Sequence, residues 1–111
     1  MVKYKLDQNN GNTIGYAEGI DYARSKAFSY LMNKKRWDIY IVNTKTGELA
    51  GVVYYESKKK DRYGDVLGPM YWSEKKNKDY LLDFDGSLFD VKTNKRIPGS
   101  VTGKLIAASL R

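Results

Sequence analysis

The chain has 111 residues, a formal net charge of +7 at pH 7, and neither cysteine nor histidine. This length is typical of one domain, and we expect residues 1–111 to form one. Without cysteine the chain has no disulfide, thiolate metal site or thiol redox chemistry, and without histidine as well it cannot build the usual nucleophilic triads. We therefore predict a non-catalytic protein without a cofactor.

The sequence also indicates a cellular compartment. No apolar run approaches the length of a membrane span, and residues 1–10 lack the apolar segment of a secretory signal. We expect a cytoplasmic protein without membrane partners. The composition, rich in lysine, tyrosine and asparagine, resembles that of small proteins from AT-rich bacterial genomes and their phages or mobile elements. That likeness points to no functional residue.

The first predicted elements are a strand and a helix. Residues 2–6 alternate apolar and basic side chains, as a strand with one face toward water does, and residues 8–12 have the composition of a turn. Residues 13–16 either extend this strand or pair with it. Between residues 19 and 34, apolar side chains recur at three- and four-residue steps, which predicts a helix with one apolar stripe. The stripe consists of Ile20, Ala23, Ala27, Tyr30 and Leu31.

A hairpin follows the helix. Residues 37–42 and 48–56 are its strands, and Gly47 supplies a left-handed position in the turn between them. The polar residues 57–68 form a loop, after which strand-like residues resume at 70–72.

A second hairpin is predicted from residue 79 to residue 91. If Asp85 and Gly86 form a two-residue turn, Leu82 lies opposite Phe89. Residues 92–95 form another turn, similar to the one at 45–49, and shared turn chemistry explains that similarity better than duplication does. A short strand at 96–97 follows. Residues 101–111 form a short helix, an added strand or a frayed, flexible end.

These elements predict an α+β fold in the order β-α-β-β-β-β. A mainly antiparallel sheet of about five strands has one face covered by the helix, because two strands alone are marginally stable. The predicted core contains Ile20, Ala23, Ala27, Leu31, Trp37, Ile39, Ile41, Val53, Leu82, Phe84 and Phe89.

Acidic residues between 79 and 90 are the candidates for a metal or catalytic site. They include an Asp-x-Asp-Gly string, but an EF-hand loop that began at Asp83 would end on a glutamate where this chain has Asn94. We therefore predict no metal site. Asp83 and Asp90 could serve as a catalytic pair only in a cleft, and we expect them to face water.

A cluster of basic and aromatic residues is the best candidate surface for an anionic partner. Aromatic rings among cations hold single-stranded nucleic acid by stacking and phosphate contact. A solvated loop beside strand-forming tyrosines would explain the same residues. Lysine outnumbers arginine 15 to 5, which weakens a sequence-specific interpretation. The cluster consists of Tyr54, Tyr55, Lys58, Lys59, Lys60, Arg62 and Tyr63, and the candidate surface residues are Tyr55, Lys58, Lys59, Lys60, Arg62 and Tyr63.

The residues leave three classes of function open. A module that binds another protein is the leading hypothesis, because the alternatives lack their residues, and an exposed apolar patch would favour it. Binding of single-stranded nucleic acid is second, and a basic stripe with exposed aromatic rings would favour it. A carboxylate-based enzyme is a distant third, favoured by a deep pocket with converging carboxylates.

Overall fold

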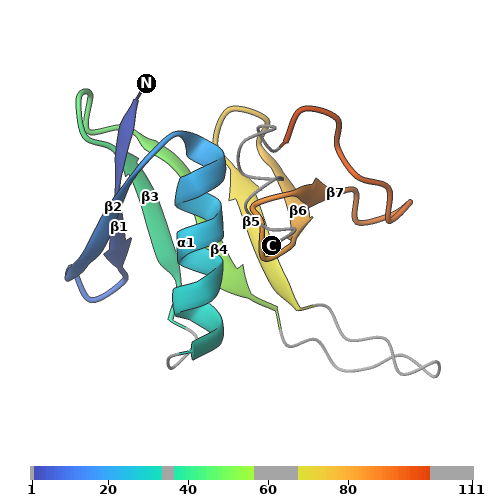
Figure 1. Cartoon of the computed structure of the whole chain (residues 1–111), viewed down its shortest axis with the longest axis horizontal. Helices are drawn as coiled ribbons and strands as arrows, with labels where there is room; N and C mark the ends of the chain where they lie inside the picture. The colour runs from blue at the N-terminus through green and yellow to red at the C-terminus, as the bar shows by residue number, and fades with distance from the viewer. Residues whose placement is uncertain (1, 34–36, 57–67, 101–111) are drawn as a thin grey trace.

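A computed structural model describes residues 2–33, 37–56 and 68–100. The fold is α+β, as predicted. Within these residues, one helix packs against an antiparallel sheet of seven strands in the order β2-β1-β3-β4-β5-β6-β7 (Figure 1). The prediction of about five strands was too low. Residues 13–18 form an edge strand of their own, and residues 69–73 pair on both sides.

The described elements follow one another with short connections, apart from the segment between β4 and β5. The helix ends at Asn33, and the predicted last residue, 34, lies outside the described residues. The elements are β1 (Lys3–Gln8), β2 (Thr13–Glu18), α1 (Ile20–Asn33), β3 (Ile39–Asn43), β4 (Leu49–Tyr55), β5 (Pro69–Ser73), β6 (Lys78–Leu82) and β7 (Leu88–Phe89).

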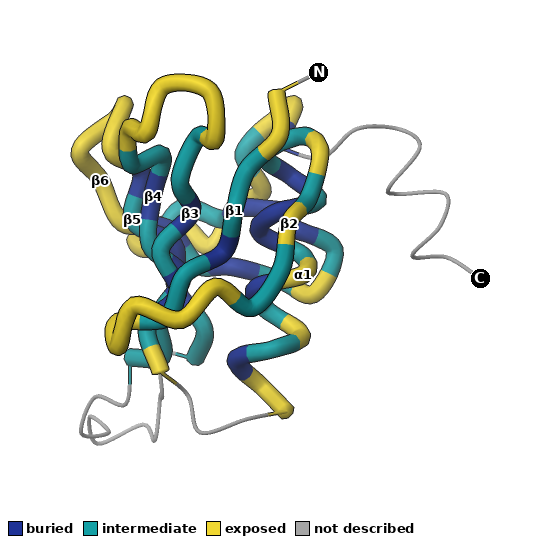
Figure 2. The backbone as a smooth tube through the Cα atoms, turned by 90° about the vertical axis from the view of Figure 1, so that its left-hand side faces the viewer, coloured by how far each residue is buried: buried dark blue, intermediate teal, exposed yellow. Residues whose placement is uncertain are grey.

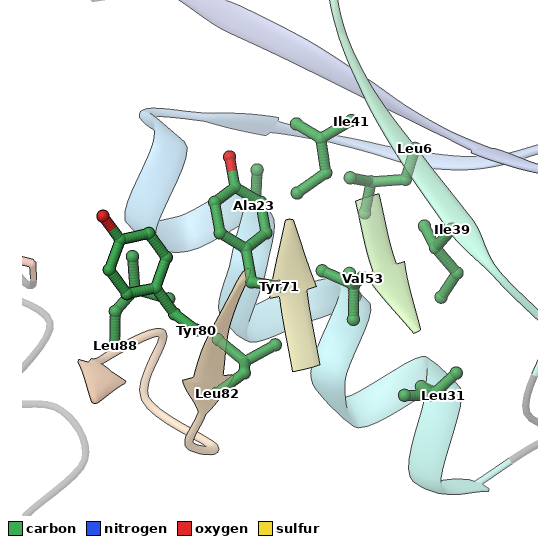
Figure 3. Close-up of a cluster of buried hydrophobic side chains, with 11 residues drawn as sticks. Leu6, Ala23, Leu31, Ile39, Ile41, Val53, Tyr71, Tyr80, Leu82 and Leu88 are labelled. Atoms are coloured by element: carbon green, nitrogen blue, oxygen red, sulfur yellow. The ribbon is translucent and has the colours of Figure 1, made fainter. Parts of the chain in front are cut away.

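The core lies between α1 and one face of the sheet (Figure 3). The small side chains of Ala23 and Ala27 have no exposed surface, which lets α1 approach the strands closely. Alternate strand positions supply the opposite side of the core, and each fully buried leucine or isoleucine stabilises the fold by roughly 1.5–3 kcal/mol. The fully buried strand residues are Leu6, Ile39, Ile41 and Val53.

The predicted core needs three corrections. Trp37 is 40% exposed, because it precedes the first paired residue of β3. Phe84 is 51% exposed, and Phe89 is half-buried on the opposite face of the sheet. The prediction also omitted core residues, namely Leu6, Tyr71, Tyr80 and Leu88.

The turn between β6 and β7 explains two of these corrections. The amide of Gly86 donates to the carbonyl of Asp83, and the amide of Asp83 donates to the carbonyl of Ser87, so the turn holds three residues rather than two. Gly86 takes a φ of 89°, as the last position of such a turn requires. The extra residue pairs Leu82 with Leu88. A one-residue slip exchanges the faces of a strand, so Leu88 points inward and Phe89 outward.

Candidate interaction surface

The face of the sheet opposite α1 is apolar and aromatic along its middle strands. Residues directly opposite one another in an antiparallel sheet point to the same side, so the register defines this face. One row crosses the strands from β1 to β6 and consists of Asp7, Tyr40, Val52, Trp72 and Asp79. A second row consists of Tyr54, Met70, Leu81, Phe89 and Arg96. We call these two rows the helix-free face.

Most of these side chains are half-buried, and the register places them opposite one another on neighbouring strands. Tyr40, Val52 and Trp72 form the centre, and no helix in the described part of the chain lies over them (Figure 2). Met70 is 3% exposed although it does not belong to the core under α1. Met70 is therefore a buried apolar residue on the side of the sheet that α1 leaves uncovered.

The border of the helix-free face is acidic, although the whole chain is basic. The alternation of strand residues places more acids than bases on this side. Lys5 forms a salt bridge with Asp7 at 3.3 Å, and the ammonium of Lys3 lies 5.1 Å from the centre of the Tyr16 ring. Among the described residues, the acids on this border are Asp7, Glu18, Asp38, Glu56 and Asp79, and the bases are Lys3, Lys5 and Arg96.

The hydroxyl group of Tyr54 lies beside some of these acids. Its hydroxyl donates a hydrogen bond to the carboxylate of Asp79 at 2.6 Å. Burial raises the pKa of the Tyr54 hydroxyl above its usual value, and the hydrogen bond to Asp79 and the nearby charge of Glu56 raise it further. The carboxylates of Asp79 and Glu56 would repel a phosphate group placed beside Tyr54.

The predicted anionic-partner surface is only partly within the described structure. Tyr55 lies on the α1 side of β4 and packs against the core, whereas its neighbour Tyr54 lies on the helix-free face. The structure therefore does not bring these two tyrosines together. The basic residues Lys58, Lys59, Lys60 and Arg62, with Tyr63, lie outside the described residues, as does the segment 101–111.

The acids between residues 79 and 90 do not converge. Asp83 and Asp85 accept hydrogen bonds from the amides of Phe84 and Ser87 within their own turn. Asp90 accepts hydrogen bonds from the amides of Lys92 and Thr93. Asp79 instead accepts a hydrogen bond from the hydroxyl of Tyr54 on the helix-free face. Within residues 2–33, 37–56 and 68–100, no three acidic residues stand close enough together to hold a metal ion.

Positive charge gathers instead at one end of the sheet. β3, β5 and β7 run in the same direction, so the turns after them lie at the same end. These turns, at residues 43–48, 73–78 and 90–95, are called the turn end. They contain six lysines and three acids. The six lysines of the turn end thus lie outside the two rows of the helix-free face.

Comparisons with protein-family models, with curated proteins and with solved structures found no match to this chain. Within the described residues, no helix has the length and apolar character needed to cross a membrane.

Proposed function

We propose that this protein is a non-catalytic interaction module whose helix-free face binds a protein with an apolar surface and a basic rim. One observation carries the proposal, namely the apolar centre at Tyr40, Val52 and Trp72 with acids at both ends of the row. Aromatic residues in the centre of a patch with charged residues around them are the usual composition of a protein–protein interface.

The same face is a poor support for nucleic acid. Stacking of bases needs cations beside the rings to hold the phosphates, but Asp38, Glu56 and Asp79 surround Tyr54. The lysines of the turn end favour single-stranded nucleic acid as the second candidate, since the turns supply positive charge without nearby exposed rings. Binding there would depend on charge alone and would fall steeply with added salt.

Site-specific photo-crosslinking tests the proposal. A benzoylphenylalanine at position 40 replaces Tyr40 on the helix-free face, and a matched one at position 29 replaces the exposed Ser29 of α1. In a nuclease-treated lysate of cells that express the protein, we expect position 40 to give one discrete protein adduct and position 29 to give none of it. The cross-linked segment of that protein should combine apolar side chains with lysine or arginine.

Two outcomes would contradict the proposal. Identical adducts from both positions would show that contact with the helix-free face is non-specific. An adduct at position 40 that disappears on nuclease treatment would replace the protein partner with nucleic acid.

A further inference from the structure

A cleft of about 620 Å³ opens at the turn end, on the α1 side of the sheet. Its walls are largely apolar, from Ile20 of α1, Ala50 of β4, Leu88 of β7 and Ile97 beyond it. Tyr71 and Tyr80 form part of the floor, and both point away from the helix-free face. The volume lies within the range of small-molecule sites, roughly 300–1,000 Å³. This cleft is separate from the surface proposed to bind a protein.

Arg24 brings a positive charge to the wall of this cleft, although the residue is only 5% exposed. The Nε group donates to the carbonyl of Gly86 at 2.9 Å, an Nη group donates to the carbonyl of Ser100, and the guanidinium carbon lies 5.2 Å from the centre of the Tyr71 ring. A guanidinium has five N–H donors, so these contacts leave donors for another acceptor.

These three contacts of Arg24 are with neutral groups. Within the described residues, the salt bridges join Lys5 to Asp7 and Lys78 to Asp90, and none involves Arg24. Burial lowers the pKa of Arg24, while Tyr71 and the charge of Asp21 act in the opposite direction. An arginine keeps its proton in proteins, so a positive charge remains in a site of low polarity.

We propose that the cleft binds a monoanionic amphiphile, with a carboxylate against Arg24 and an aliphatic or aromatic body between Ile20, Leu88 and Ile97. A carboxylate matches the fork of donors on a guanidinium and supplies a negative charge in direct contact with it. The rim favours a single charge over a polyanion, because Glu48 and Glu74 balance Lys75 and Lys76.

Calorimetric titration with octanoate, and with octan-1-ol as an uncharged probe of equal length, tests this inference. We expect saturable binding of octanoate to the full chain, at least about tenfold tighter than binding of the alcohol, since a hydrogen bond to a charged group discriminates by that amount or more. Amide shifts in NMR spectra should change at Gly86 and Leu88. The indole signal of Trp72, on the helix-free face, should not move.

Three variants make the test specific. Arg24→Met should remove the preference for the acid and leave the alcohol's affinity unchanged. Ala50→Leu should weaken the binding of both probes, because the larger side chain fills part of the cleft. This variant still tests whether the probes bind in the cleft if the Arg24 variant fails to fold. The double variant Lys92→Ala, Lys95→Ala removes two lysines of the turn end that do not line the cleft, and it should leave octanoate binding unchanged.

Equal affinity for acid and alcohol would overturn the inference, as would the absence of saturable octanoate binding. Loss of octanoate binding in the Lys92, Lys95 variant would also overturn it, because overall charge would then account for the attraction. None of these outcomes bears on the helix-free face, so this inference and the proposed protein partner fail separately.

Discussion

Gly51 shows how a single residue sets the spacing of the core. A Cβ atom at this position would lie 2.3 Å from the hydroxyl oxygen of Tyr71 and 2.4 Å from the carbonyl oxygen of Trp72. The Trp72 oxygen belongs to the backbone of β5 and cannot turn aside. A side chain at Gly51 would therefore push β4 and β5 apart.

We expect Gly51→Ala to lower the free energy of unfolding by at least about 1–3 kcal/mol, the usual cost of overpacking a core. Chemical denaturation measures the change. Gly68→Ala is the matched control, since nothing lies within 4 Å of its added Cβ. Equal stability of the two variants would show that β4 and β5 are not as close as described.

Arg24 has a structural consequence apart from any ligand. Its two hydrogen bonds join α1 to the turn at Gly86 and to Ser100, whose side chain in turn accepts a bond from the amide of Leu88. Arg24→Met would leave two buried carbonyls without a donor, at about 1–3 kcal/mol each. Thermal unfolding should show this loss, with Lys26→Met on the same helix as the control. A Tm equal to that of Lys26→Met would contradict a structural role for the two hydrogen bonds of Arg24.

At the scale of elements, the three turns at one end of the sheet share a construction. In each, the first residue offers a side-chain oxygen to amides within the turn, from Asn43, Ser73 and Asp90. The fifth residue takes a positive φ, as Gly47, Asn77 and Asn94 do. Asparagine and glycine tolerate that region best. The similarity seen in the sequence at residues 45–49 and 92–97 is thus one of turn chemistry, as predicted.

Asp90 makes the turn at residues 90–95 sensitive to acid. Hydrogen bonds from the amides of Thr93 and Lys92, together with Lys78, lower the pKa of the Asp90 carboxyl to about 2 from 3.8. Because the carboxyl has a lower pKa in the folded protein than in the unfolded chain, its ionised form stabilises the fold at any pH above the unfolded-state pKa. That contribution is lost as the pH falls from about 4 through about 2. Asp90→Asn should therefore be less stable than wild type at pH 5–7, and this difference should shrink as the pH falls from about 4 through about 2.

Unfolding free energies measured across this pH range test the prediction. Asn43→Asp is the matched variant, because the Asn43 side chain accepts the equivalent bonds in its own turn. It should gain an acid-dependent contribution of the kind that Asp90→Asn loses. A stability difference between Asp90→Asn and wild type that stays constant with pH would contradict this role of the carboxylate.

Local sequence patterns were sufficient for some elements and not for others. The helix was predictable because Ala23, Ala27 and Leu31 recur at helical spacing. The register of β6 and β7 was not, because Asp85-Gly86 fits both a two-residue turn and the last two positions of a three-residue turn. Phe84 and Phe89 were misplaced for that reason. The edge strand β2 was only one of two alternatives, because the sequence at residues 13–16 does not distinguish extension of β1 from pairing with it.

At the scale of the whole molecule, positive and negative charge predominate on different parts of the described surface. In the part of the chain that the structure describes, the turn end holds six lysines and three acids, whereas the helix-free face is bordered by five acids and three bases. The net charge of +7 gave no sign of this separation, because it depends on which strand positions face the same way. For the same reason the candidate surface could not be predicted from the sequence, since Tyr40, Val52 and Trp72 are far apart in the chain. Their common row exists only once the register is known.

The charge separation also defines how a partner would approach. A protein with a basic rim would be drawn to the acidic border of the helix-free face and repelled by the turn end. Attraction of this kind acts mainly on the rate of association and weakens with salt, while the apolar centre supplies most of the affinity. Val52, at the middle of the central strand β4, is therefore the position most sensitive to substitution.

The most direct measurement is the affinity of the partner captured at position 40 for wild type, for Val52→Lys and for Ser29→Lys, by calorimetric titration. Both variants add one positive charge, but only Val52 lies on the helix-free face. We expect Val52→Lys, with a cooperative unfolding transition retained, to bind at least about tenfold more weakly than wild type, and Ser29→Lys to bind equally well. Wild-type affinity in a folded Val52→Lys variant would contradict the proposal that this face is the binding surface.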